Sequence, residues 1–439
     1  MIRRMLTLAL LPALIPLIHV SASDQTPAPP QDHPIVLTGG EIHIVSGPTI
    51  SNGQLLFTDG RLVEIGRRVT VPPGAEVIDV SGMEVYPGFI AAETTIGLGE
   101  IQAVRASLDS RETGLINPNV RAERAYHTDS EHIPVSRSNG VAIAHVAPVG
   151  GLLSGSSAVM MLDGWTWEDA LLKDQAGIWV NWPEMAPPRS NDPDTVKKHK
   201  QQLEETLKHL DEAFDQAAIY QRAKSAGTAN LQTDLRWEAL EPVLAGRVPL
   251  FIRATRLGQI TAAINWTRRR GLRLVLVEPT DAWMVTDLLR EHDIPVILPH
   301  IHDLPLRRWS PYDEAFTLPA TLHAAGVTFC FTGQNLQPRN ISYEAGKAVA
   351  FGLPRDEAIK ALTLNAARVL GVDQRIGSLE VGKDATLIVT NGDPLDIRSH
   401  VEMMFIQGRR VDLTSKHTQL YEKYRERHRQ LGIEGGGKR

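Results

Sequence analysis

The sequence predicts an α/β protein, in which a (β/α)8 TIM-type barrel is joined to a small β domain formed by both ends of the chain. Three observations support this fold. Strand-like and helix-like segments alternate through the middle of the chain, at residues 87–375. Short apolar runs separated by glycine turns lie on either side, at 35–86 and 376–413. The 439 residues, 42% of them hydrophobic, suffice to build both parts.

The first 22 residues are typical of a secretory signal peptide. Two arginines precede an apolar run at 6–18, and residues 20–22 offer a cleavage site. A membrane anchor is the alternative, but this run is short for a transmembrane helix. We therefore expect an exported protein, in the bacterial periplasm, with no membrane span after cleavage. The proline-rich residues 23–34 would form a stiff lead-in.

Cysteine content and charge exclude two further features. Cys330 is the only cysteine, so the chain has no internal disulfide. It lies in the apolar segment "VTFCFT", where we expect a buried, inert thiol. The net charge is −5, which gives no basic field for a nucleic acid, and we expect no such partner.

The two flanking segments share a pattern of short apolar runs and turns. The first contains "IVLTGGEIHIV" and "GQLLFTDGRLVEIG", and the second contains "ATLIVTNGDPLD" and "VEMMFIQGRRVDL". Such runs, interrupted by glycine every ten to twenty residues, are typical of antiparallel strands. Because one segment lies at each end of the chain, we expect them to pair into one composite β domain.

The middle of the chain carries the predicted barrel strands. Seven are short, rich in Val, Ile and Leu, and apolar on both faces, as buried parallel strands are: 88–93, 141–147, 177–181, 249–254, 273–278, 294–299 and 327–332. We assign the eighth to "SAVMMLD", residues 157–163. Alternation with helices over this length favours a (β/α)8 barrel. Residues 414–439 form an amphipathic helix and tail, and we expect the helix to pack against the protein.

Four stretches carry a resemblance to a known family: "VYPGFIAAETTIGLGE", "NGVAIAHVAPVGGLLSGSSAVMMLDGWTWED", "RNISYEAGKAVAFGLPRDEAIKALTLNAARVLGV" and "RIGSLEVGKDATLIVTNGDPLD". The chain resembles the amidohydrolase superfamily, in particular its imidazolonepropionase-like and prolidase-like branch. The resemblance covers nearly the whole chain after the signal peptide. It implies a (β/α)8 barrel plus a β-sandwich-like domain made from both termini, in agreement with the pattern above.

The resemblance also implies a metal site at the mouth of the barrel. In the family, an H-x-H pair on the first barrel strand, two later histidines and an aspartate hold one or two divalent metals, which activate water for hydrolysis. This sequence has other residues at those positions: Glu93 and Thr95 for the pair, Arg253 and Glu278 for the later histidines, and Gly333 or Gln334 for the aspartate. We therefore expect no metal and no catalytic residue of the family type.

Arg253 would repel a cation placed beside it. An unpaired arginine buried in a barrel is costly, so we expect one of two partners. Either Arg253 pairs with Glu278 in the vacated metal position, or it binds an anionic ligand in a bidentate way.

A rebuilt metal site is the alternative. His300 and His302 lie in "LPHIHDLP", directly after a predicted barrel strand. Together with Glu93 and Glu278 they would form a ligand set that suits zinc or manganese.

Two further residues are candidates for the pocket. His145 ends the second predicted strand beside the turn "APVGGLLSGSS". It would either bind a substrate carboxylate or be a partly solvated histidine at a strand end. Tyr343, in "SYEAG", is expected in the pocket wall or in packing.

Three functional interpretations follow. The first is a catalytically impaired or non-catalytic homologue, such as the partner subunit of an active paralogue. The second is an active hydrolase of amide C–N bonds, in dipeptides or non-peptide compounds, with a rebuilt or metal-free site. The third is a periplasmic protein that binds a small anionic molecule in the barrel mouth. Each allows a small-molecule ligand and assembly as a homodimer or heteromer.

Overall fold

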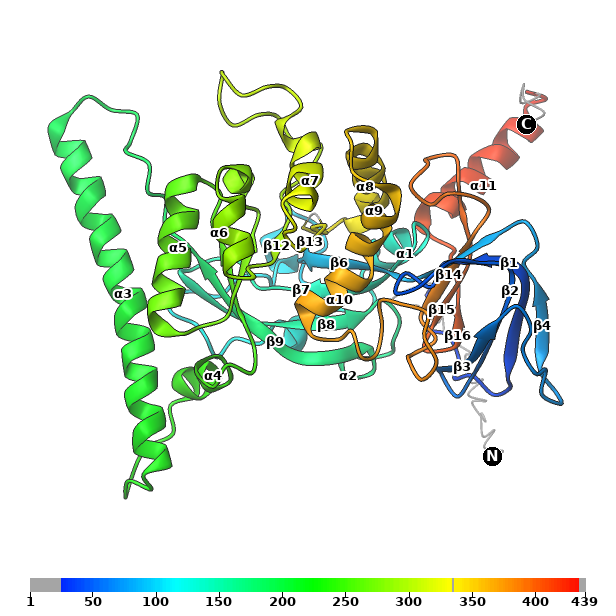
Figure 1. The fold of residues 1–439 in the computed structure, drawn as a ribbon, viewed down its shortest axis with the longest axis horizontal. Helices are drawn as coiled ribbons and strands as arrows, with labels where there is room; N and C mark the ends of the chain where they lie inside the picture. Colours follow the sequence, from blue (N-terminus) through cyan, green and yellow to red (C-terminus); the bar gives the residue numbers. More distant parts are fainter. Residues whose placement is uncertain (1–24, 334, 434–439) are drawn as a thin grey trace, which may run out of the picture.

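The computed structural model describes residues 25–333 and 335–433, which form two eight-stranded sheets, with most of the helices around the second sheet (Figure 1). The predicted signal peptide and Gln334 lie outside the described residues. The first sheet combines strands from both ends of the chain, and the second contains the strands of the middle region.

The composite sheet has the strand order β16-β15-β14-β5-β1-β2-β3, with β4 also paired to β1. Its strands are β1 (Ile35–Ile42), β2 (Ile50–Thr58), β3 (Arg61–Gly66), β4 (Glu76–Asp79), β5 (Glu84–Pro87), β14 (Leu387–Thr390), β15 (Val401–Ile406) and β16 (Arg409–Val411). Leu37, Phe57, Leu387 and Phe405 belong to the separate apolar core of this sheet. Seven of these strands form one continuous hydrogen-bonded path, and the two ends of the chain meet where β14 pairs with β5.

The second sheet has the strand order β13-β12-β11-β10-β9-β8-β7-β6. Its strands are β6 (Phe89–Thr94), β7 (Val141–Val146), β8 (Leu153–Met161), β9 (Leu171–Asn181), β10 (Leu250–Arg253), β11 (Leu274–Val277), β12 (Val296–Ile297) and β13 (Phe329–Cys330). Two backbone bonds draw its edges together: Ala92 N–H donates to the Phe331 carbonyl (3.3 Å) and Gly333 N–H to the Glu93 carbonyl (2.6 Å). The sheet is therefore a nearly closed barrel.

The eighth barrel strand differs from the prediction in direction. β8 runs antiparallel to both of its neighbours, β7 and β9. Only a short turn that contains Gly150 and Gly151, both at positive φ, connects β7 to β8. A parallel crossover needs about a dozen residues or more, so a connection this short permits only a hairpin. The barrel thus contains seven parallel strands and one reversed strand, in place of eight parallel strands.

Most of the helices lie around the outside of the barrel (Figure 1). The helices are α1 (His132–Arg137), α2 (Trp167–Ala170), α3 (Pro193–Ser225), α4 (Leu235–Leu244), α5 (Leu257–Arg270), α6 (Thr286–Glu291), α7 (Glu314–Ala324), α8 (Ile341–Ala350), α9 (Arg355–Leu362), α10 (Leu364–Leu370) and α11 (Lys416–Gln430), with short 3₁₀ turns at Arg105–Ser107, Ala122–Ala125, Thr280–Met284 and Pro338–Asn340. The long α3 begins at the cap Asp192, whose carboxylate accepts from the N–H groups of Asp194 and Thr195.

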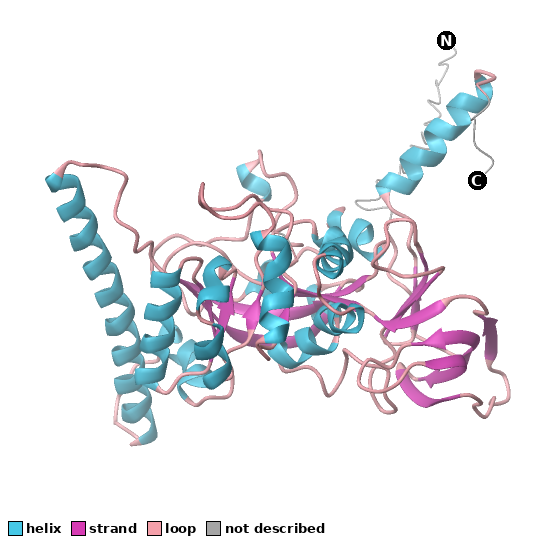
Figure 2. Cartoon of the chain, turned by 45° about the horizontal axis from the view of Figure 1, so that its top comes forward, coloured by secondary structure: helices cyan, strands magenta, loops and turns pink. Residues whose placement is uncertain are grey.

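The prediction that the C-terminal helix packs against the protein was wrong. None of the residues of α11 is buried, and the helix extends away from both sheets (Figure 2). Its apolar residues therefore belong to neither of the two apolar cores in the part of the chain that the structure describes. Within that same part, no helix has the length and apolar character needed to cross a bilayer.

Candidate functional site

The carboxyl ends of the parallel strands form the mouth of the barrel, as in other barrels of this class. Four strand ends place polar side chains there: Glu93 near the end of β6, Asn181 at the end of β9, Arg253 at the end of β10 and Glu278 directly after β11. Parallel pairing in register sets Arg253 between Asn181 and Val277. The sequence positions that the resemblance connects with metal ligands therefore do come together at one place.

Arg253 is the centre of this cluster. Its Nη2 donates to Glu93 Oε1 (2.9 Å), its Nε to Glu278 Oε2 (3.1 Å) and its Nη1 to Asn181 Oδ1 (2.9 Å). Its guanidinium carbon lies 5.2 Å from the centre of the buried Trp179 ring. The side chain is 22% exposed. The sequence predicted that Arg253 pairs either with Glu278 or with an anionic ligand. In the structure Arg253 pairs with Glu278 and also with Glu93.

Glu93 is held from both sides. Its side chain is 2% exposed, and its second oxygen accepts a hydrogen bond from Thr332 Oγ1 (2.8 Å). Thr332 lies on the segment after β13, so this bond also joins the two edges of the barrel. A buried carboxylate needs such partners, because an unpaired charge in this environment is strongly unfavourable. The Arg253 and Thr332 bonds together use both oxygens of Glu93.

Glu278 has an unusual backbone conformation. Its φ is 54°, in the left-handed region that non-glycine residues rarely adopt. A backbone bond from its N–H to the Ile297 carbonyl (2.8 Å) holds it there. Burial and the nearby Glu93 carboxylate raise the pKa of Glu278, and Arg253 opposes this shift. The side chain is 28% exposed, so this carboxyl group remains accessible from the mouth.

Gly333 is packed too tightly to accept a side chain. A Cβ at this position would lie 2.7 Å from Ala91 Cβ and 2.7 Å from the Glu93 carbonyl oxygen. The family's aspartate therefore has no room here with the present backbone. Thr95, the second residue of the former pair, is 5% exposed, and its N–H donates to the Asn335 carbonyl (2.8 Å).

The two histidines of the alternative metal site have different surroundings, and His300 interacts electrostatically with Glu278. His300 Nδ1 lies 3.5 Å from Glu344 Oε1 on α8, and this carboxylate raises the pKa of His300. His302 is exposed in the loop that follows. Among residues 25–333 and 335–433, no group of three His, Cys, Asp or Glu side chains is arranged to hold a metal ion. With an arginine between Glu93 and Glu278, the donor set does not fit the divalent metal that the fold family implies.

His145 lies inside the barrel rather than on its mouth. It is fully buried, with Nδ1 2.7 Å from the Ala92 carbonyl oxygen and Nε2 2.7 Å from Ser157 Oγ. Burial lowers its pKa to about 4, so the ring is neutral near pH 7. Neither the substrate-binding role nor the partly solvated strand end that the sequence allowed agrees with this position. Tyr343 lies half-buried on α8, beside Glu344 in the sequence.

Sequence reasoning missed three members of the mouth cluster: Asn181, Thr332 and Trp179. Their residue types do not mark them as functional. Their positions could have indicated a role in the site, because Asn181 and Thr332 each end a predicted barrel strand. Residues at the carboxyl ends of barrel strands form the sites of this architecture.

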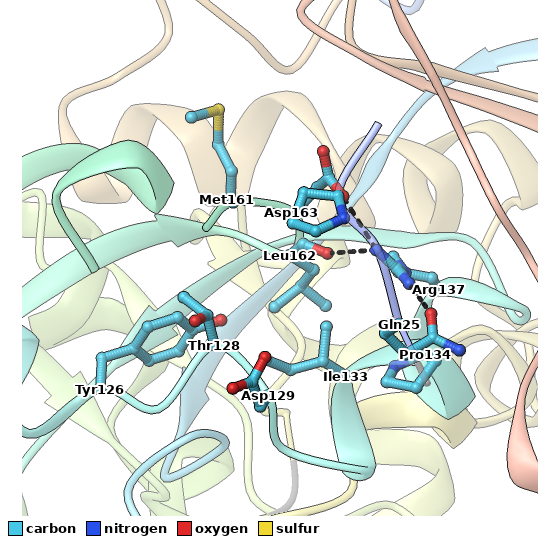
Figure 3. A pocket seen from close by; sticks show the side chains of 12 residues that line it. Gln25, Tyr126, Thr128, Asp129, Ile133, Pro134, Arg137, Met161, Leu162 and Asp163 are labelled. Carbon is cyan, nitrogen blue, oxygen red and sulfur yellow. Dashed lines mark hydrogen bonds and ion pairs between the residues drawn. The ribbon is translucent and has the colours of Figure 1, made fainter. Parts of the chain in front are cut away.

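A second buried ion cluster lies away from the mouth, in the pocket of Figure 3. Arg137 on α1 donates to Asp163 (3.1 Å), to the Leu162 carbonyl (3.2 Å) and to Gln25 Oε1 (2.6 Å). Arg409 on β16 forms a further ion pair with Asp163 (3.1 Å). The cluster therefore links the lead-in segment, the barrel and the composite sheet.

Comparisons with known proteins agree with this architecture. A model of the amidohydrolase family matches residues 278–415. Amidohydrolase tasK of Hapsidospora irregularis is 21% identical over 397 residues, which are 81% of this chain and 39% of tasK. The chain thus spans about two fifths of the length of that relative. The imidazolonepropionase of Thermoplasma acidophilum is 24% identical over 384 residues, which are 83% of this chain and 87% of the relative.

Solved structures share the fold. The crystal structure of an amidohydrolase from Thermotoga maritima MSB8 aligns with a TM-score of 0.77 and 26% identity, over 86% of this chain and 99% of the other. A prolidase complexed with N-methylphosphonate-L-proline aligns with a TM-score of 0.54 and 17% identity, which concerns the fold alone. The barrel, the family match and these solved structures together support the assignment of this chain to the amidohydrolase superfamily.

Proposed function

We propose that this chain is a non-catalytic member of its superfamily, in which an arginine-centred ion cluster has replaced the divalent-metal site. The bonding of Arg253 carries this proposal. One guanidinium bonds to Glu93, Glu278 and Asn181, at the place where the family's metal ligands would converge. A fixed positive charge there neutralises carboxylates that would otherwise attract a cation. Thr95 and Gly333 supply no nitrogen or carboxylate ligand beside it.

The loss of the metal removes the two contributions that it makes to amide hydrolysis, which are activation of water and polarisation of the carbonyl. None of the described residues around Arg253 replaces both contributions. The guanidinium could stabilise a developing negative charge, but its own hydrogen bonds already go to carboxylates and an amide. We therefore favour a role for the intact scaffold, such as partner subunit of an active paralogue, over chemistry in its own mouth.

One observation favours the second candidate, a metal-free hydrolase. Glu278 combines a strained backbone, a raised pKa and partial exposure. Such strain costs on the order of 1 kcal/mol or more, and it tends to be found at functional sites. A carboxyl group in this state can act as a general acid or base for a bound amide.

A panel of dipeptides and N-acyl amino acids, tested at millimolar concentration with the wild-type chain and Glu278→Gln, distinguishes the two candidates. The proposal predicts no hydrolysis above the uncatalysed rate by either protein. Turnover by the wild type that Glu278→Gln abolishes would reject the non-catalytic role and establish the metal-free hydrolase. Turnover that survives in Glu278→Gln but disappears with a chelator would reject both.

The third interpretation, capture of a small anionic molecule, has less support. Arg253 is the cation that would receive such a ligand, and two carboxylates already neutralise it. An added anion would face a cluster with an excess of negative charge.

Export to the periplasm and assembly with an active paralogue belong to the same proposal. The apolar run near the N-terminus supports export, and the intact scaffold supports a structural role. Co-expression with a paralogue from the same source, followed by mass measurement of the purified particle, tests the assembly. A heteromer of defined stoichiometry is expected, and two separate homogeneous species would contradict it.

A further inference from the structure

α11 is an extended arm that contacts α1 and contains no buried residue. It begins at the cap Ser415, whose Oγ accepts from Thr418 N–H, and then projects away from the two sheets (Figures 1 and 2). None of its residues is buried. An isolated helix of about 15 residues is only marginally stable in water. A surface that covers one face of α11 would therefore stabilise it.

One face of α11 is apolar. At 100° per residue, Leu420, Tyr421, Tyr424 and Leu431, which directly follows the helix, fall on a single stripe that also contains His417 and His428. The exposed fractions of the four apolar residues are 40%, 64%, 52% and 58%. We call these four residues the apolar stripe. It is the kind of unpaired apolar surface that marks an interaction site.

The charges of α11 are arranged around this stripe. α11 contains five lysines and arginines and two glutamates, whereas the whole chain has a net charge of −5. The basic residues flank the stripe on both sides: Lys416, Lys423 and Arg427 on one, Arg425 and Arg429 on the other. Glu422 and Glu426 lie on the far face and pair with Arg425 and Arg429. The helix is thus a basic arm on an acidic protein.

This pattern selects one kind of partner. A helix with an apolar stripe, basic flanks and an acidic far face suits the boundary between lipid headgroups and acyl chains. The long basic side chains can extend to phosphate groups while their stems lie along the apolar layer. A second copy of α11 would instead bring positive charge against positive charge.

We propose that α11 seats this protein on an anionic lipid surface, with the apolar stripe inserted below the headgroups and the flanking cations at the level of the phosphates. The helix lies on the bilayer and does not cross it. The proposal does not depend on whether the barrel mouth is catalytic.

Sedimentation of the full chain with lipid vesicles tests the proposal. We expect binding to vesicles that contain phosphatidylglycerol and phosphatidylcholine. Binding to vesicles of phosphatidylcholine alone should be weaker by roughly tenfold or more, because each basic residue near an anionic surface contributes to attraction. Raising the salt concentration should reduce the binding, since salt screens these charges. Equal binding to both kinds of vesicle, or binding to neither, would overturn the proposal.

Two variants test whether the apolar stripe is responsible for the vesicle binding. Tyr424→Glu adds a charge within the stripe, whereas Gln419→Glu adds the same charge on the polar face. We expect the first to lose most of the binding and the second to retain most of it. Both positions are exposed, so both variants should fold, which equal melting temperatures would verify. The N-terminal apolar run is present in every variant, so differences between variants report on α11 alone.

Equal loss of binding in the two variants would contradict the proposal, because the stripe would then have no special role. A different result would also overturn it: a dimer in the absence of vesicles that Tyr424→Glu converts to a monomer, with no vesicle binding by the wild type. In that case the stripe would be an interface between copies of the chain.

Discussion

Two arginine–carboxylate clusters lie at opposite ends of the barrel, and their compositions are reversed. At the mouth, Arg253 lies between Glu93 and Glu278. Near the amino ends of the parallel strands, where the end of β8 meets the start of β7, Asp163 lies between Arg137 and Arg409. The first cluster has an excess of negative charge, and the second an excess of positive charge.

The clusters also differ in what they join. The Asp163 cluster connects the lead-in, α1 and β16 in a nearly solvent-free setting, with side-chain exposures of 1% for Asp163 and 5% for Arg137. The mouth cluster connects neighbouring strand ends and is open to solvent at Arg253 and Glu278. The comparison indicates that the Asp163 cluster holds the fold together and the mouth cluster occupies a site. Four predictions can break or sharpen this distinction.

The largest effect is expected for Asp163→Ala. Burial raises the pKa of Asp163 despite its two arginines, so the cluster is not a large net source of stability. Removing one partner nevertheless leaves Arg137 buried without its carboxylate, which should cost about 3–5 kcal/mol in unfolding free energy. Urea titration measures this loss. Asp287→Ala, at an exposed ion pair with Arg290, is the control and should change stability by less than about 1 kcal/mol. Similar losses in the two variants would contradict the structural role.

Arg253→Met should be the next most damaging change. It leaves Glu93 and Glu278 facing each other without a cation, and about 2 kcal/mol of stability should be lost at pH 7, less than for Asp163→Ala because the mouth is partly solvated. The loss should shrink near pH 4, where protonation removes the repulsion. Thermal unfolding at both pH values provides the measurement, with Arg253→Lys as a charge-preserving control. A loss that is the same at both pH values would exclude carboxylate repulsion as its cause.

Gly333→Ala should destabilise by about 1–3 kcal/mol, because the new Cβ would collide with Ala91 and the Glu93 carbonyl. Gly333→Asp should be at least as damaging and should not create a metal site. Gly258→Ala on α5 is the matched control: nothing lies within 4 Å of its Cβ position, so alanine should be neutral or slightly stabilising. A stable Gly333→Asp protein that binds zinc would refute the packing argument.

The smallest effect concerns pH and Glu278. Because the folded pKa of Glu278 lies above its ordinary value of 4.5, the folded state holds this proton more tightly than the unfolded state. Its contribution to stability must then fall as pH rises from 4.5 through the folded pKa. Glu278→Gln should lack this component, by on the order of 1 kcal/mol between about pH 4 and pH 8. Melting temperatures of both proteins across that range test it, and parallel pH profiles would show that Glu278 does not carry the shift.

Much of the barrel could be predicted from the sequence, and the reasons are physical. Strands buried on both faces must be apolar throughout, so runs such as "LVLV" at 274–277 can be recognised in the sequence as buried strands. The residues of a strand do not show in the same way whether it runs parallel or antiparallel to its neighbours. The reversal of β8 follows from the short connection between β7 and β8.

The candidate site was harder to predict than the fold. Alignment with the family placed Glu93, Arg253 and Glu278 together, but residue types alone could not show that one arginine bonds both carboxylates. The left-handed backbone of Glu278 and the tight packing at Gly333 are tertiary features. His145 demonstrates the reverse case: a histidine at a strand position suggested chemistry, and the structure buries it with two hydrogen-bond partners.

The central claim is that an arginine has taken the place of the metal, and metal content tests it most directly. The full chain, purified without added metal or chelator, would be analysed for zinc and manganese before and after exposure to an excess of each and removal of the free ions. We predict no stoichiometric metal in either state, because the Arg253 guanidinium lies between Glu93 and Glu278 and would repel a cation placed there. A stoichiometric metal ion that Glu93→Gln or Glu278→Gln removes would contradict the claim and restore the mouth as a metal centre.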